Sequence, residues 1–283
     1  MTIAAQEPNP RDSTGYYYSG ESTQFACRAD QRFSYCMYVP SGYAARTAPL
    51  PLVVLQHGTG RRGPQYRDNF ADFAEAHNAV VLAPLFPAAI EDPEDLHNFK
   101  FIKYHDIRFD LILLSMVDEV AEKLEIESER FLLHGFSGGG QFSHRFFYLH
   151  PDRLRAVSIG APGRLTLIDE TQDWWLGWKG MDDALGMRPK PELLPSVPVQ
   201  MVVGDRDVET WEINNPGESN WMDGAEKAGA TRVERLHTLR RNFEEHGISV
   251  RFDLVPDVAH EPMKVLGRVK DFFSTILNKD DSQ

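Results

Sequence analysis

The chain has 283 residues, of which 42% are hydrophobic and 25% are charged. This composition is typical of a folded globular protein and excludes an intrinsically disordered or fibrous one. Lysine and arginine total 30 against 42 aspartate and glutamate residues, a net charge of -12, and because nucleic-acid binding depends on clustered cations, this balance argues against a nucleic-acid partner.

The apolar and cysteine-containing segments bear on where the protein works. The most apolar stretch, residues 79–90, contains two prolines and is too short to cross a bilayer, so no membrane partner is expected. The first residues have neither the early cations nor the apolar core of a secretion signal. Two cysteines, Cys27 and Cys36, fit a reducing cytoplasm, which is the expected location. Spacing alone leaves open whether the two pair.

The chain begins with a polar, proline-containing segment, residues 1–20, which indicates a loose N-terminal arm before a single domain over 21–283. Residues 25–40 are rich in aromatic residues around a polar turn, a pattern that predicts an antiparallel hairpin. Short apolar runs then alternate with longer amphipathic segments. The apolar runs predict strands at 51–56, 79–85, 130–135, 155–160, 197–204 and 250–256.

The amphipathic segments between the predicted strands indicate helices that pack on a sheet. Residues 108–124 predict one helix, and residues 231–247 predict another that ends at the capping glycine Gly247. A last helix is expected over 265–277. This alternation predicts an α/β fold with a mostly parallel central sheet, an antiparallel hairpin in front and helices on both faces. The helix over 108–124 is expected to bury Leu111, Leu114, Val117, Val120, Ala121 and Leu124.

One segment interrupts this alternation. Residues 164–197 are bounded by prolines and contain Trp174, Trp175 and Trp178, which predicts a small lid insertion near the strand ends. The tryptophan faces fit the wall of a substrate pocket, and they fit equally well the packing of the insertion onto the domain. Both interpretations stay open from the sequence.

The strongest functional motif is GFSGG at 135–139, which matches Gly-x-Ser-x-Gly between a predicted strand and a predicted helix. In this motif the serine occupies a sharp strand-to-helix turn, and the glycines let the backbone pass close to its neighbours. The turn exposes the serine hydroxyl to substrate, so Ser137 is the candidate nucleophile. The alternative is a glycine-rich helix start at which Ser137 acts only as a cap.

A serine nucleophile needs a base, and the base needs an acid that orients it. His260 follows the last predicted strand, and Asp205 and Asp207 follow the strand before it, so all three are expected at the sheet edge that holds Ser137. Of the two acids we favour Asp207, which reaches forward from the loop, and expect Asp205 to cap the turn. Ser137, Asp207 and His260 then form a predicted catalytic triad.

The segment after the first predicted parallel strand contains a glycine-rich turn, HGTG at 57–60. The backbone N–H groups of Thr59 and of Gly138, the residue after the nucleophile, are expected to form an oxyanion hole. His57 is expected to brace the turn.

Arg61 and Arg62 follow directly after this turn. In a chain of net charge -12, two adjacent cations beside the site offer attraction to an anionic substrate. Arg61 is the candidate substrate contact, and a solvated pair at the surface is the alternative.

Two weaker motifs point to other chemistry. The sequence GTGRRG at 58–63 satisfies Gly-x-Gly-x-x-Gly, but no acidic residue ends the next predicted strand to hold a ribose, so no dinucleotide cofactor is expected. The sequence HEPMK at 260–264 begins a zinc-binding His-Glu-x-x-His pattern but ends in lysine. We therefore expect neither a cofactor nor a metal.

These residues resemble the α/β-hydrolase superfamily over about residues 50–278. The hairpin that leads into FSYCMYVPSGY, the segment PLVVLQHGTG and the segment GFSGGGQFSHRFFYLHPDRLRAVSIGAPG are similar to bacterial esterases related to polyhydroxybutyrate depolymerases and feruloyl esterases. The resemblance implies an α/β-hydrolase fold and a serine hydrolase that forms a covalent acyl-enzyme without a cofactor.

The sequence therefore predicts a hydrolase of small-molecule carboxylic esters. An amidase, peptidase or acyltransferase with the same triad is the first alternative. The second alternative is a binding protein that keeps the fold without the chemistry.

Overall fold

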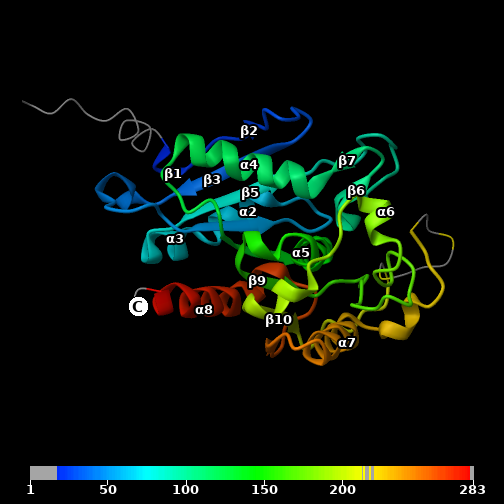
Figure 1. Cartoon of the computed structure of the whole chain (residues 1–283). Helices are drawn as coiled ribbons and strands as arrows, with labels where there is room; N and C mark the ends of the chain where they lie inside the picture. The colour runs from blue at the N-terminus through cyan, green and yellow to red at the C-terminus, as the bar shows by residue number, and fades with distance from the viewer. Residues whose placement is uncertain (1–17, 212, 214–216, 218–219, 281–283) are drawn as a thin grey trace, which may run out of the picture.

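A mixed β-sheet forms the centre of the molecule, with helices packed on both of its faces (Figure 1). The computed structural model describes residues 18–211, 213, 217 and 220–280. The strands are β1 (Gly20–Glu21), β2 (Phe25–Ala26), β3 (Ser34–Val39), β4 (Leu52–Gln56), β5 (Val80–Leu85), β6 (Lys103–Tyr104), β7 (Ile107–Arg108), β8 (Phe131–Phe136), β9 (Leu154–Gly160), β10 (Val199–Gly204) and β11 (Val250–Val255).

The central sheet has nine strands in the order β1-β3-β5-β4-β8-β9-β10-β11, with β2 also paired to β3. Every neighbouring pair from β5 to β11 is parallel, whereas β3 runs antiparallel to β1, β2 and β5. Strands β6 and β7 form a separate antiparallel pair. Since parallel strands end at one edge, the loops after β4, β8, β10 and β11 meet there.

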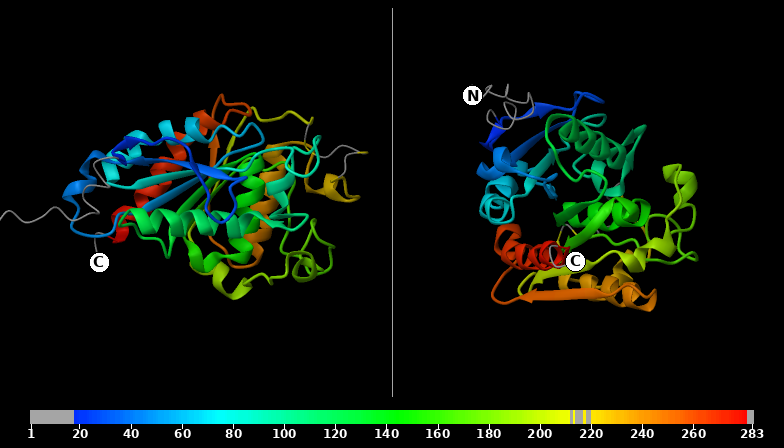
Figure 2. Two further views of the ribbon diagram at one scale, coloured as in Figure 1. Left: turned by 90° about the horizontal axis from the view of Figure 1, so that it is seen from above. Right: turned by 60° about the vertical axis from the view of Figure 1, so that its left-hand side comes forward.

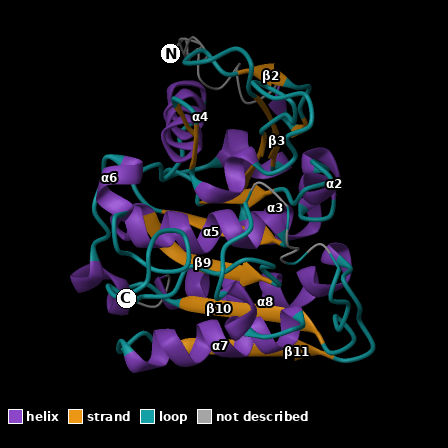
Figure 3. Cartoon of the chain, turned by 90° about the vertical axis from the view of Figure 1, so that its right-hand side faces the viewer, coloured by secondary structure: helices purple, strands orange, loops and turns teal. Residues whose placement is uncertain are grey.

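Helices cover both faces of the sheet, with α2, α3 and α8 on one side and α4, α5 and α7 on the other (Figures 2 and 3). Among the described helices, none is long and apolar enough to span a bilayer. The α-helices are α2 (Gly63–Asp68), α3 (Ala71–His77), α4 (Phe109–Lys123), α5 (Gly138–Leu149), α6 (Met181–Leu185), α7 (Arg232–Glu245) and α8 (Pro262–Asp280). The 3-10 helices are η1 (Ser41–Ala45), η2 (Asn98–Phe101), η3 (Pro151–Arg153), η4 (Pro191–Ser196) and η5 (Ala225–Ala228).

The predicted alternation of strands and helices is confirmed. The hairpin expected over 25–40 forms from β2 and β3, and the expected parallel strands are β4, β5, β8, β9, β10 and β11. Cys27 and Cys36 are buried, free thiols. The proposed N-terminal arm, residues 1–20, lies outside the described residues up to residue 17, and the extent of the domain stays a prediction.

Helix α4 buries a different stripe from the one that the sequence predicted. Leu111 is 43% exposed, and Leu114 is only partly buried. The reason is the start of the helix, where Phe109 is fully buried and sets which positions three and four residues later face the sheet. The buried apolar residues of α4 are Phe109, Leu113, Met116, Val117 and Val120.

The insertion over 164–197 contains the short helices α6 and η4 and packs on the domain. The ring of Trp178 lies 5.1 Å from that of Tyr148 in α5. The ring of Trp175 lies 5.4 Å from that of Phe101 in η2. Both tryptophans are buried, so these contacts support the packing interpretation. A lid function of the insertion stays a prediction.

Two fully buried histidines give the fold an acid-sensitive core. His57 and His134 have no exposed surface, and burial lowers the pKa of each to about 3. An unfolded histidine titrates at about pH 6.5, so between about pH 6.5 and about pH 3 only the unfolded chain binds these protons. Their contribution to stability is therefore complete above about pH 6.5 and is lost as the pH falls, by about 1.4 kcal/mol per pH unit for each histidine.

We expect His134→Gln to flatten this pH dependence by about 1.4 kcal/mol per pH unit below about pH 6, because the variant removes one of the protons bound only on unfolding. Urea unfolding between neutral and mildly acid pH measures the free energy of unfolding. His246→Gln, at an exposed position, is the matched control. Equal slopes for the wild type and His134→Gln would contradict a neutral imidazole at this position.

Candidate active site

Ser137 lies at the junction of β8 and α5, at the carboxyl edge of the sheet. Its φ of 59° and ψ of -116° fall in a region that residues other than glycine rarely adopt. The Ser137 N–H donates to the carbonyl oxygen of Gly160, at the end of β9, over 2.8 Å. This sharp turn presents the serine side chain beyond the strand end, as the sequence motif predicts.

Two glycines make room for this turn. A Cβ atom on Gly135 would lie 2.3 Å from the carbonyl oxygen of Gly139, and one on Gly139 would lie 2.4 Å from the carbonyl oxygen of Gln56 in β4. Both approaches are far inside van der Waals contact and involve backbone atoms, which cannot rotate away. The start of α5 therefore packs against the sheet only because these two positions lack side chains.

Asp207 and His260 form a hydrogen-bonded pair on the loops that follow β10 and β11. His260 Nδ1 lies 2.6 Å from Asp207 Oδ2, and because a carboxylate only accepts, Nδ1 is the donor. Asp207 is fully buried, whereas Asp205 is exposed. Of the two acids that the sequence offered, only Asp207 contacts the histidine. The buried Arg232 lies 3.6 Å from the other carboxylate oxygen, Oδ1.

Backbone hydrogen bonds fix these two loops to each other. The N–H of Asp205 donates to the carbonyl oxygen of Val255 over 2.9 Å, and the N–H of Arg206 donates to that of Val258 over 2.9 Å. The loops thus extend the pairing of β10 with β11 beyond the strand ends. Asp207 and His260 are held in register by the sheet itself.

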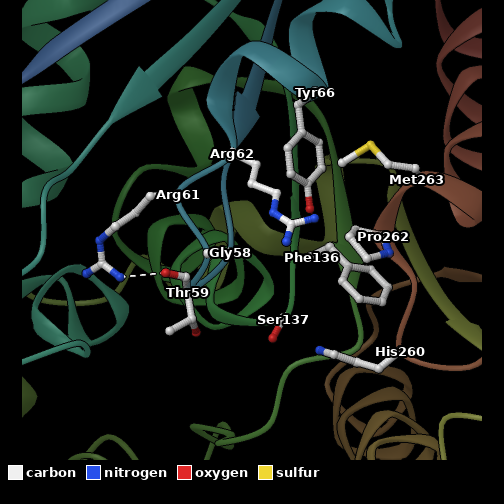
Figure 4. A pocket seen from close by; sticks show the side chains of 11 residues that line it. Gly58, Thr59, Arg61, Arg62, Tyr66, Phe136, Ser137, His260, Pro262 and Met263 are labelled. Atoms are coloured by element: carbon white, nitrogen blue, oxygen red, sulfur yellow. Dashed lines mark hydrogen bonds between the residues drawn. The ribbon is translucent and has the colours of Figure 1, made fainter.

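Ser137 and His260 line the same pocket, together with residues of the turn after β4 and the first residues of α8. Figure 4 shows the nitrogen-bearing edge of the imidazole directed toward the serine hydroxyl. The ring of Phe136 packs against that of His260, with 4.9 Å between their centroids. The pocket therefore brings together a hydroxyl, an imidazole and, through that imidazole, a buried carboxylate.

The turn after β4 brings a backbone nitrogen to the start of α5. The nitrogen of Thr59 lies 3.2 Å from the position that a Cβ atom on Gly138 would occupy, so the two expected oxyanion donors are neighbours. His57 donates from Nδ1 to the carbonyl oxygen of Gly58 over 2.8 Å and accepts at Nε2 from the N–H of Phe86 over 2.9 Å. The low pKa of His57 keeps it neutral, and these bonds support the expected bracing role.

The two arginines after this turn have different surroundings. Arg61 donates to the carbonyl oxygens of Thr59 and Phe86 over 2.7 and 3.0 Å. Its guanidinium points away from Ser137 in Figure 4. Arg62 is exposed, its guanidinium lies over the pocket, and it has no hydrogen-bond partner among the described residues. A substrate contact by Arg61 stays a prediction, and Arg62 is the arginine with free donors.

The three tryptophans of the insertion are not among the residues that line the pocket of Ser137 and His260. Trp174 and Trp175 lie instead beside the buried Arg145 of α5, whose guanidinium carbon is 5.9 Å from each indole ring. Their contact with substrate stays a prediction, and this pocket gives it no support.

Sequence reasoning missed two polar side chains near the nucleophile. Lys100 of η2 is buried, and its Cε lies 2.9 Å from the position of a Cβ atom on Gly138. Its ammonium group donates to Nδ1 of His97 over 2.6 Å. Tyr66 of α2 lines the pocket. Neither residue belongs to a recognisable motif, and only the folded chain brings them to the site.

Histidine, cysteine and acidic side chains were also compared with the needs of a metal ion. Within the described part of the chain, no group of three or more of them could hold one.

Solved structures resemble the chain over most of its length. Poly(aspartic acid) hydrolase-1 from Sphingomonas sp. KT-1 matches with a TM-score of 0.73 and 20% identity, over 89% of this chain and 98% of that one. The poly(3-hydroxybutyrate) depolymerase LpqC from Bordetella parapertussis matches with a TM-score of 0.70 and 23% identity, over 91% of each chain. The chain has the α/β-hydrolase fold.

A more distant member of this α/β-hydrolase group is an S-formylglutathione hydrolase from Agrobacterium tumefaciens, with a TM-score of 0.60 and 13% identity over 98% of this chain and 99% of that one. No protein-family model and no curated protein matches the sequence. The fold that the sequence resemblance implied is thereby confirmed. In an α/β-hydrolase the nucleophile, acid and base follow separate strands in the order Ser, Asp, His, and Ser137, Asp207 and His260 stand after β8, β10 and β11.

Proposed function

We propose that the protein is a serine hydrolase that cleaves small-molecule carboxylic esters, with Ser137, His260 and Asp207 as its catalytic triad. The observation that supports this most is one pocket that holds the Ser137 hydroxyl and the His260 imidazole, while the buried Asp207 binds the other imidazole nitrogen. The printed names of the structural neighbours are those of hydrolases and a depolymerase, which favours the same reaction class.

In the first half-reaction, Ser137 Oγ attacks the acyl carbon and its proton passes to His260 Nε2. Nε2 is the basic nitrogen because Nδ1 donates to Asp207. The carboxylate stabilises the imidazolium that forms, and the N–H groups of Thr59 and Gly138 bind the developing oxyanion. Removal of one such donor typically lowers kcat by about 10²- to 10³-fold. The alcohol leaves with the proton from His260, and the acyl group stays on Ser137 as an ester.

In the second half-reaction, water attacks the acyl-enzyme as His260 Nε2 takes its proton. The tetrahedral intermediate uses the same oxyanion donors. It collapses with return of the proton to Ser137 Oγ, and the carboxylic acid leaves. All groups needed for both steps come from the chain, so the proposed reaction requires no cofactor.

The cell compartment is part of the same proposal. The buried, unpaired thiols Cys27 and Cys36 fit a reducing cytoplasm. The extent of the domain over 21–283, with a lid insertion over 164–197, also remains our proposal.

A substrate panel tests the reaction class. We expect 4-nitrophenyl esters from acetate to dodecanoate to be hydrolysed, with an initial burst of nitrophenol wherever deacylation limits turnover. Matched 4-nitroanilides should react at least about 100-fold more slowly, because their leaving group is poorer. Comparable rates on esters and anilides would assign the protein to the amidases. Failure of the folded protein to cleave any ester would contradict the proposal.

A further inference from the structure

Arg62 and Tyr66 present donors to the pocket that no described side chain or carbonyl uses. Both line the pocket of Ser137. Arg62 is the N-cap of α2 and Tyr66 lies four residues later, where its N–H donates to the Arg62 carbonyl oxygen over 3.3 Å. Residues four apart lie on the same face of a helix. Figure 4 accordingly shows the Arg62 guanidinium and the Tyr66 hydroxyl directed at the same part of the pocket.

The Tyr66 side chain is buried up to its hydroxyl. The residue is 2% exposed, and its ring packs 6.3 Å from that of His134 beneath the sheet edge. Burial raises the pKa of the phenol above its ordinary value, so the hydroxyl stays a proton donor at neutral pH. A buried donor without a partner is costly unless a ligand satisfies it.

The charge around Arg62 is also uncompensated. Among the described residues that line the pocket, none is acidic, although the chain as a whole carries a net charge of -12. The remaining wall near the two donors is apolar and consists of Phe136, Pro262 and Met263. An arginine fork and a phenol hydroxyl over an apolar wall match a carboxylate on a short carbon chain.

We propose that Arg62 and Tyr66 form a carboxylate-binding subsite, so that the preferred ester carries a second, ionised carboxyl group. This inference rests on the proposed function, because the subsite adjoins Ser137 in the same pocket. Arg62 supplies the charge and Tyr66 a second hydrogen bond. The carboxylate belongs to either the acyl part or the alcohol part of the ester, and the experiment separates the two.

The experiment compares pairs of esters that differ only in charge. Monomethyl glutarate and its carboxamide analogue, methyl 5-amino-5-oxopentanoate, carry the test group on the acyl side. The pair 4-acetoxybutanoate and 4-acetoxybutanamide carries it on the alcohol side. We expect the wild type to prefer the carboxylate at least about 10-fold in kcat/KM in one pair, which identifies the side. Arg62→Gln should remove most of this preference, and Tyr66→Phe should reduce it about 3-fold.

Arg188→Gln is the control for net charge, because it removes the same charge from an exposed arginine outside the pocket. It should keep the wild-type preference. High salt should weaken the preference of the wild type more than that of Arg62→Gln. If both members of each pair are cleaved equally, and only when Ser137 is present, the subsite is wrong and the proposed hydrolase stands.

Binding without turnover tests the subsite independently of catalysis. Calorimetric titration of glutarate into Ser137→Ala, and into the same variant with Arg62→Gln, should show about 10-fold weaker binding in the second protein. Equal affinities, or no binding to either protein, would overturn the subsite even if no ester proves to be a substrate.

Discussion

Ser137→Ala is expected to lower kcat for ester hydrolysis by about 10⁴- to 10⁶-fold while the fold is retained. The variant removes the only atom that forms the acyl-enzyme, and the remaining oxyanion donors and binding contacts account for the residual rate. The alanine keeps a Cβ atom at the strained turn, so the packing of α5 on β4 and β8 is unchanged. Initial rates on a 4-nitrophenyl ester measure the effect, and circular dichroism checks the fold.

Ser143→Ala is the matched control for this variant. Ser143 lies in the same helix and is buried, its hydroxyl has no hydrogen-bond partner within the described structure, and it does not line the pocket. It should retain near wild-type activity. Loss of activity in Ser143→Ala with retention in Ser137→Ala would contradict the assignment of the nucleophile.

Asp207→Asn is expected to lower kcat by about 10³- to 10⁴-fold with a much smaller effect on KM. An asparagine amide donates a hydrogen bond to His260 Nδ1 and so favours the tautomer with the proton on Nε2, which is the nitrogen that must accept the proton of Ser137. The variant also leaves the buried Arg232 without its carboxylate neighbour. Steady-state kinetics on a soluble ester separate kcat from KM.

Asp205→Asn is the control for this position, because it changes an exposed acid two residues away on the same loop. We expect it to stay within a few-fold of the wild type. A larger loss in Asp205→Asn than in Asp207→Asn would make the exposed acid the orienting residue and contradict the hydrogen bond of 2.6 Å between Asp207 and His260.

The parallel strands and the nucleophile turn could be predicted from the sequence because each leaves a local signal. Strands covered on both faces are short apolar runs, and β4, β8 and β10 were found from that pattern. The turn at Ser137 requires glycines at 135 and 139, where side chains would overlap the backbone. Such close packing writes its requirement directly into neighbouring residues of the chain.

Features that depend on contacts distant in sequence could not be predicted in this way. The stripe of α4 was misplaced because Leu111 and Phe109 are both apolar, and only packing against the sheet decides which is buried. Arg232 stands in α7 with no motif around it, yet it lies beside Asp207. The two arginines after β4 look equivalent in sequence, and the backbone carbonyls that bind Arg61 but not Arg62 distinguish them.

The reactivity of Ser137 toward an alkyl fluorophosphonate tests the central claim most directly. The probe forms a stable covalent bond with a serine only where a base and an oxyanion hole activate it. We predict one adduct per chain by intact-mass spectrometry, located by peptide mapping on Ser137, with activity lost in proportion to labelling. An active protein that resists the probe, or that is inactivated by an adduct on another residue, would contradict the account.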